Sequence, residues 1–83
     1  MVSENDLLRR LARSTGLTRP EIRRFVDLDV LLVRGGLAEA TMTRRLRRAR
    51  RLRRDLGLSL DAVAIILRLL DRIEALQQAQ TQR

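Results

Sequence analysis

The chain has 83 residues and a formal net charge of +8, and every one of its positive side chains is arginine. It contains no cysteine and no histidine, which excludes disulfides and removes the usual zinc ligands, the commonest general base and the thiol nucleophile. The remaining hydroxyls and carboxylates form no catalytic pattern, so we expect a non-enzymatic protein with no catalytic residues, metal or cofactor. No signal-like start or window of ~18 uncharged apolar residues is present, which predicts a cytoplasmic protein that does not span a membrane.

Residues 6–28 predict two short helices joined by a turn at Gly16, where a left-handed residue can end the first helix. The second helix starts at Thr18, and Glu21 follows three residues later, as a capping box requires. Such a pair of helices is typical of a helix-turn-helix. The apolar residues are spaced for one buried face on each helix: Leu7, Leu8 and Leu11 on the first, and Ile22, Phe25 and Val26 on the second.

Residues 30–42 predict a short connection in the place of a wing. The run from Val30 to Val33 has the composition of a short strand, and the pair Gly35-Gly36 indicates a loop. The loop carries one positive charge, at Arg34, and no aromatic side chain. We therefore expect the wing to be reduced.

Residues 43–56 predict an arginine-rich helix that is capped by Thr41 or Thr43 and ends at Gly57. Eight of the eleven residues from 44 to 54 are arginine. The apolar residues form one narrow stripe: Leu46, Ala49, Leu52 and Leu56. Arg45 and Arg53 fall at the edges of this stripe, where they would snorkel or pair with an acid.

Two interpretations of the arginine run stay open. It can be the solvated face of a scaffold helix, with internal ion pairs to Asp27, Asp29 or Asp55 and a general attraction for acidic partners. It can also contact phosphates directly, and neutralising six phosphates would give a log–log salt slope of about −5.

Ser59 is expected to cap the last and longest helix, which is predicted to reach about Gln78, with residues 77–83 fraying. Its apolar positions cover an arc of roughly 200°, whereas a single core-facing stripe needs about 100°. One part of the arc can face the core: Val63, Ile66, Leu67 and Leu70. The other part predicts a homodimer interface: Ile65, Leu69, Ile73 and Leu76.

This layout resembles the MerR superfamily. The resemblance lies in LARSTGLTRPEIRRFVDLDVL at residues 11–31 and in RRLRRARRLRRDLGLSL at residues 44–60. Within the superfamily, AIILRLLDRIEALQQ at residues 64–78 is similar to the C-terminal helix of CbpM-type chaperone modulators. The resemblance implies one all-α domain over residues 1–83: a four-helix MerR-like helix-turn-helix with a reduced wing and a long C-terminal dimerisation helix.

The resemblance also implies a function. Chaperone modulators of this type bind the J-domain of a DnaJ-type co-chaperone, or help to assemble the DnaK–DnaJ system, and usually dimerise through the last helix. One departure matters, because modulators often have an acidic or neutral second helix, whereas Arg19, Arg23 and Arg24 are basic here. A MerR-like DNA-binding transcriptional regulator is therefore the alternative, and charge alone also permits an RNA- or ribosome-associated protein.

Each interpretation has its own candidate residues. A J-domain carries a basic helix that docks on acidic surface, so the acidic cluster of the second helix and its neighbouring arginines form the predicted partner-binding site. Its members are Glu21, Arg23, Arg24, Asp27 and Asp29. The predicted phosphate- or DNA-binding residues are Arg19, Arg23, Arg24, Arg44, Arg47, Arg48 and Arg51.

Overall fold

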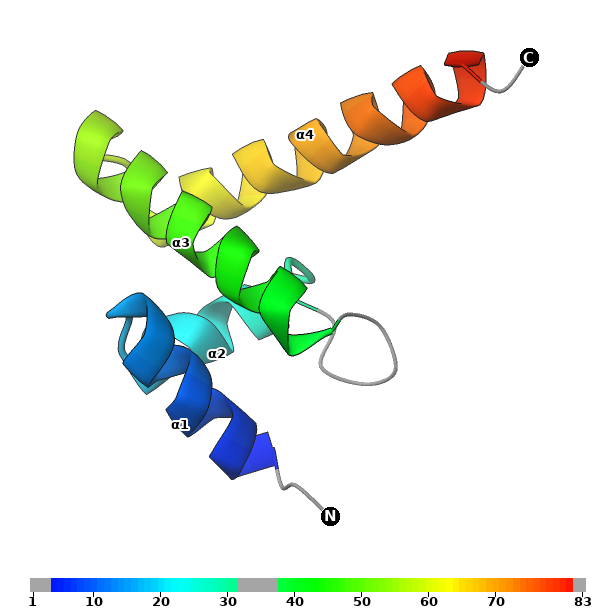
Figure 1. Cartoon of the computed structure of the whole chain (residues 1–83). Helices are drawn as coiled ribbons and strands as arrows, with labels where there is room; N and C mark the ends of the chain where they lie inside the picture. The colour runs from blue at the N-terminus through cyan, green and yellow to red at the C-terminus, as the bar shows by residue number, and fades with distance from the viewer. Residues whose placement is uncertain (1–3, 32–37, 82–83) are drawn as a thin grey trace.

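The computed structural model describes residues 4–31 and 38–81, which contain four helices and, within these ranges, no strand. The helices are α1 (Glu4–Thr15), α2 (Arg19–Asp27), α3 (Glu39–Leu56) and α4 (Leu60–Thr81). Helix α1 packs against α2 and α3, and α4 packs against α3 and α2. Figure 1 shows that the C-terminal part of α4 extends away from the other helices. The chain thus has the all-α, MerR-like helix-turn-helix fold that its sequence predicts.

The turn between α1 and α2 forms as predicted. Gly16 has φ +80°, the left-handed conformation expected of it. Thr18 accepts the backbone N–H of Glu21 on its hydroxyl oxygen at 3.2 Å, and Glu21 accepts the backbone N–H of Thr18 at 2.9 Å. This reciprocal pair is a complete capping box, which is why α2 begins where the local sequence indicates.

The C-terminal end of α2 turns the chain back into the core. Val30 donates its N–H to the carbonyl of Phe25 at 3.0 Å, Asp29 donates to Val26 at 3.1 Å, and Asp29 has φ +62°. These three features define a Schellman motif. The strand expected from Val30 is therefore wrong for residues 30–31, which form a buried bend. The rest of that segment, and most of the wing-like loop, lies outside the described residues.

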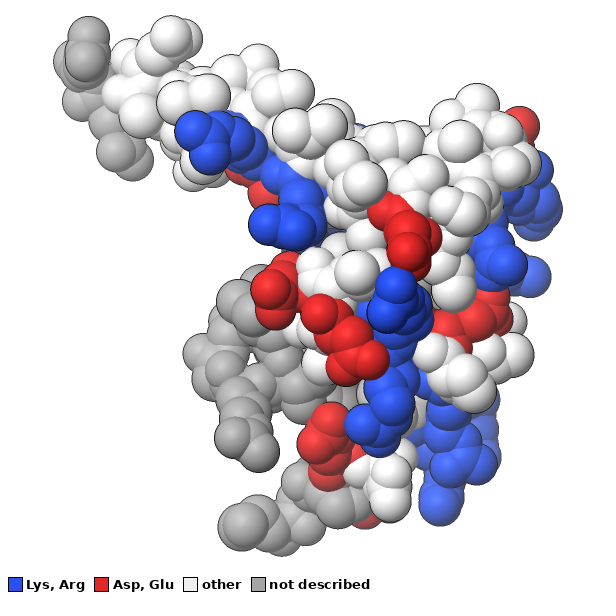
Figure 2. All heavy atoms as spheres, turned by 180° about the vertical axis from the view of Figure 1, so that it is seen from behind, with Lys and Arg blue, Asp and Glu red and all other residues white. Residues whose placement is uncertain are grey.

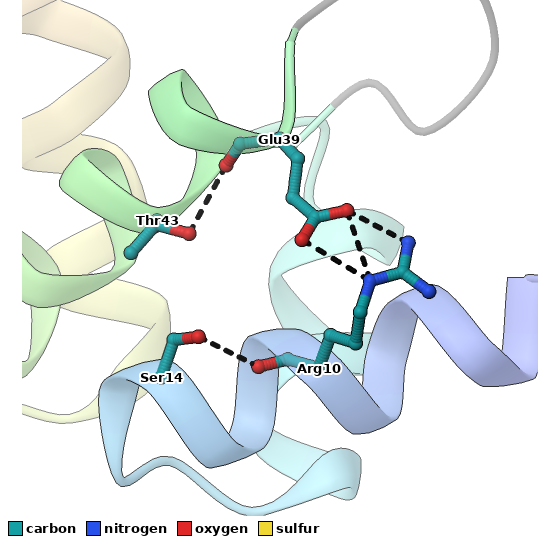
Figure 3. A network of polar contacts seen from close by, with 4 residues as sticks. All are labelled: Arg10, Ser14, Glu39 and Thr43. Atoms are coloured by element: carbon teal, nitrogen blue, oxygen red, sulfur yellow. Dashed lines mark hydrogen bonds and ion pairs between the residues drawn. The ribbon is translucent and has the colours of Figure 1, made fainter.

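Helix α3 begins earlier than predicted. It starts at Glu39 after Ala38, which makes no side-chain cap, so the expected caps at Thr41 and Thr43 are wrong. Arg10 of α1 holds Glu39 through a 2.7 Å ion pair, and Thr43 donates its hydroxyl to the Glu39 carbonyl at 3.0 Å (Figure 3). A carboxylate in the first turn also suits the helix dipole.

The junction of α3 and α4 follows the prediction at both caps. Gly57 has φ +64° directly after α3, and Ser59 accepts the backbone N–H of Ala62 at 3.1 Å. Helix α4 then continues to Thr81, so the predicted end near Gln78 and the predicted fraying are wrong for residues 77–81. Alanine and glutamine in this segment are good helix formers, which is consistent with the longer helix.

All four helices contribute to a single core. Its buried apolar residues are Leu8, Leu11, Leu17, Ile22, Phe25, Val30, Leu31, Met42, Leu46, Ala49, Val63, Ala64 and Leu67. Leu56 was expected on the inner stripe of α3, but it is 62% exposed because it lies at the end of the helix, past the last buried position. Among the described residues, no helix has both the length and the apolar character needed to cross a bilayer.

Candidate interaction surfaces

Two of the predicted partner-binding residues hold α2 in place. The carboxylate of Glu21 pairs with Arg53 of α3. The pKa of Glu21 lies below its ordinary value, first because the Thr18 backbone N–H donates to it and also because of Arg53. Arg24 forms a two-pronged pair with Asp61 of α4, at 3.1 and 3.0 Å, which also lowers the pKa of Asp61. These pairs fix α2 against both longer helices.

The other three predicted partner-binding residues are Arg23, Asp27 and Asp29. They are exposed, and their side chains make no ion pair within the described part of the chain. The scaffold interpretation expects ion pairs from the arginine run to Asp27, Asp29 or Asp55. The pairs with Asp27 and Asp29 are wrong, because acids of α4 and of the first turn of α2 reach Arg45 and Arg53 instead, whereas Asp55 lies 3.6 Å from Arg54. Figure 2 shows a face of the molecule on which acidic and basic side chains lie side by side.

Arg45 connects three elements. Its side chain is 22% exposed and forms a two-pronged pair with Asp71 of α4, at 2.8 and 2.6 Å. Its Nε donates to the carbonyl of Val30 at 3.2 Å, in the bend after α2. The hydrogen bond from Arg45 lowers the pKa of Asp71. The prediction that an arginine at the edge of the α3 stripe pairs with an acid is confirmed here.

The predicted phosphate-binding arginines of α3 fall on two different sides of the helix. Arg44 and Arg48 face α4 and line a hollow of about 330 Å³ together with Arg45, Asp71 and Glu74. Arg48 lies 3.9 Å from Glu74. Acids from α4 therefore offset most of the positive charge on this side.

Arg47 and Arg51 lie on the adjoining side of the helix, which faces the C-terminal end of α1. They share a hollow of about 260 Å³ with Arg50, Arg54, Ser14 and Thr15, and none of the described residues that line it is acidic. We call Arg47, Arg50, Arg51 and Arg54 the arginine quartet. Arg50 and Arg54 are not among the residues that the sequence predicts to bind phosphate, although the i, i+3, i+4, i+7 spacing of the four arginines indicates one helix face.

Exposed apolar side chains follow one side of α4. Ile65, Leu69, Ile73 and Leu76 are 59%, 56%, 49% and 58% exposed, and we call these four the α4 stripe. Val63 and Leu67 lie in the core, as predicted. From residue 72 to residue 81 every residue of α4 is exposed. The stripe thus continues along a part of the helix that no other described element covers (Figure 1).

A tight turn between α1 and α2, with α3 and α4 packed on this pair, defines a small helix-turn-helix domain. Residues 7–82 match a family model described as MerR HTH family regulatory protein, so the chain belongs to this family. The family consists in general of regulators rather than enzymes. A search of characterised proteins and a search of solved structures each found no significant match.

Proposed function

We propose that this regulator acts by binding another protein through the C-terminal end of α2, and that the partner is the J-domain of a DnaJ-type co-chaperone, alone or with DnaK. The observation that carries the proposal is the position of Asp27 and Asp29. Both are exposed, and neither has an ion pair among the described residues.

Asp27 and Asp29 both occupy positions at the end of α2 that are unfavourable for an aspartate. Asp27 is the last residue of α2, at the negative end of the helix dipole. Asp29 occupies the left-handed position of the Schellman motif, where glycine is the least strained residue. Exposed acids that cost stability and form no ion pair within the described chain are well explained by a positively charged surface on another molecule.

The identity of the partner rests on the resemblance of residues 64–78 to the last helix of CbpM-type modulators. The basic helix of a J-domain complements two carboxylates at the exposed end of α2. In this proposal, Glu21 and Arg24 hold the helix in position, and Arg23 lies on the exposed face beside the acids.

The test is calorimetry with the J-domain from the same organism, using the double variant Asp27→Asn/Asp29→Asn. The amides keep the shape of the side chains and remove both charges. A charge-assisted hydrogen bond contributes about 1.5–3 kcal/mol, so the affinity should fall at least tenfold. The matched control is Asp55→Asn/Glu74→Gln, which removes two exposed acids elsewhere. Unchanged affinity in the folded first variant would contradict the proposal.

We further infer that two copies associate through the α4 stripe. Every residue in the last three turns or so of α4, from residue 72 to residue 81, is exposed, and a free helix of that length is marginal in water. A second copy that packs its own stripe on the first would cover the exposed apolar residues and stabilise these turns.

DNA binding is the second candidate, favoured by the exposure of Arg19 and Arg23 on α2, where neither has an ion pair within the described residues. Against it, Arg24 is paired with Asp61, and α2 carries no Asn or Gln to read base edges. The same calorimetry with a random DNA duplex separates the two functions. Tight binding to DNA, with no heat from the J-domain, would favour the DNA-binding regulator.

A further inference from the structure

The arginine quartet is held in place by the end of α1. Arg47 donates two hydrogen bonds to the carbonyl of Ser14, at 3.3 and 3.1 Å. The guanidinium of Arg50 lies over Gly16, so close that a Cβ on that glycine would come within 3.1 Å of the Arg50 Cζ. One guanidinium of the four is thus held by a backbone carbonyl in the last turn of α1, and a second lies against the glycine that follows the helix.

Most of the charge of this surface has no acidic partner among the described residues. Arg50 and Arg51 have no ion pair among the described residues, and Arg54 has one exposed contact with Asp55 at 3.6 Å. Like charges at i, i+4 spacing repel each other on a helix, as Arg47–Arg51 and Arg50–Arg54 do here. A bound anion would relieve this repulsion. On the side of α3 that faces α4, the acids Asp71 and Glu74 of α4 reduce the repulsion instead.

The geometry points to a binding site for an anion that carries several closely spaced phosphate groups. Planar guanidiniums match the oxygens of a phosphate with two parallel hydrogen bonds. The quartet spans about 10 Å along the helix axis, so a single phosphate cannot reach all four arginines. The described residues that line the hollow are all arginine, serine or threonine, so the hollow suits the charged group and no apolar part of a ligand.

An acidic peptide is a poorer fit. Each carboxylate carries one charge, so a peptide would have to place four acidic side chains within the span of the quartet. A phosphate monoester carries about −1.5 to −2 charge at neutral pH and three acceptor oxygens. The site is independent of the proposed protein-binding function, because it lies on α3 and α1 and not at the end of α2.

The test compares two variants of the same helix by calorimetry with inorganic tripolyphosphate at low salt. Arg50→Gln/Arg51→Gln removes two charges from the quartet, and Arg44→Gln/Arg48→Gln removes two from the α4 side. We expect the first variant to lose at least tenfold in affinity and the second less than threefold. Circular dichroism confirms that both remain folded, and J-domain binding should be unchanged in the first.

A mixed-sequence DNA duplex and a polyglutamate peptide serve as further probes. Four phosphate contacts predict a slope of about −3.6 for the logarithm of the duplex affinity of the wild type against the logarithm of the salt concentration. If this slope is found and Arg50→Gln/Arg51→Gln also weakens duplex binding, the nucleic-acid backbone is a source of the phosphates. If it affects tripolyphosphate alone, the ligand is a free polyphosphate. Equal losses in both variants, no saturable binding by the wild type, or tighter binding of polyglutamate would overturn the assignment.

Discussion

Truncating Leu69 tests whether α4 pairs with a second copy of the chain. Leu69 is 56% exposed in the single chain, so Leu69→Ala leaves the core intact. Full burial of a leucine contributes about 1.5–3 kcal/mol, and burial of the exposed half contributes about 1 kcal/mol. A two-fold dimer loses this contribution in both copies, about 2 kcal/mol in all, which weakens its Kd roughly 30-fold.

Sedimentation equilibrium over a series of protein concentrations measures this effect. The control is Gln78→Ala, an exposed residue on the side of α4 away from the stripe, which should leave the Kd unchanged. The reasoning fails if the wild-type chain has a monomer mass at tens of micromolar. It also fails if Leu69→Ala and Gln78→Ala associate equally well.

Two further predictions concern the ends of α2. The pKa of Glu21 is lowered by folding, so its stabilisation is present above the ordinary value of 4.5 and is lost as the pH falls through the lower folded value. Glu21→Gln should therefore cost about 1 kcal/mol at pH 7, which corresponds to roughly 5 °C in Tm, and much less at pH 3. A difference that stays constant in thermal melts at the two pH values would contradict this. Asp29→Gly should raise the free energy of unfolding by about 1 kcal/mol in urea melts while weakening J-domain binding, because it removes both the left-handed strain and the charge. A loss of stability would show that Asp29 is structural.

The sequence predicts the helix boundaries that depend on neighbouring residues. The capping box at Thr18 and Glu21 and the left-handed glycine at position 57 need only local bonds, and both form. The start of α3 depends instead on Arg10, which lies 29 residues away from Glu39. Local capping preferences cannot include such a contact, and they placed the start too late.

The bend after α2 shows how a local motif overrides composition. Val30 and Leu31 belong to a β-branched and leucine-rich run that favours a strand. The Schellman bonds and the positive φ of Asp29 instead bury them as part of the core. An aspartate in a position that favours glycine is hard to anticipate, and with glycine there the turn would have been evident from the sequence.

The candidate surfaces were only partly predictable for a similar reason. Helical spacing places the apolar residues of α4 on two sides, and the exposures of the α4 stripe agree with this. Spacing places the arginines of α3 in one broad band, in which Arg44 and Arg51 lie only about 20° apart around the helix. It does not show which face meets Asp71 and Glu74, because that depends on how α4 crosses α3. The quartet can be told apart from the other arginines of α3 only when the positions of Asp71 and Glu74 in the fold are known.

A net charge of +8 therefore says little about what this protein binds until the ion pairs are assigned. Arginines such as Arg24, Arg45 and Arg53 join the helices to one another, and their charge is largely offset by their partners. The three candidate binding surfaces lie apart from these ion pairs. They are the acids at the end of α2, the arginine quartet where α3 faces α1, and the apolar stripe on α4. Because these surfaces lie on different helices, a substitution in one leaves the other two in place. The three proposed activities, binding of a J-domain, of phosphates and of a second copy, should consequently each be lost alone, and a variant that lost all three together would indicate unfolding rather than a shared site.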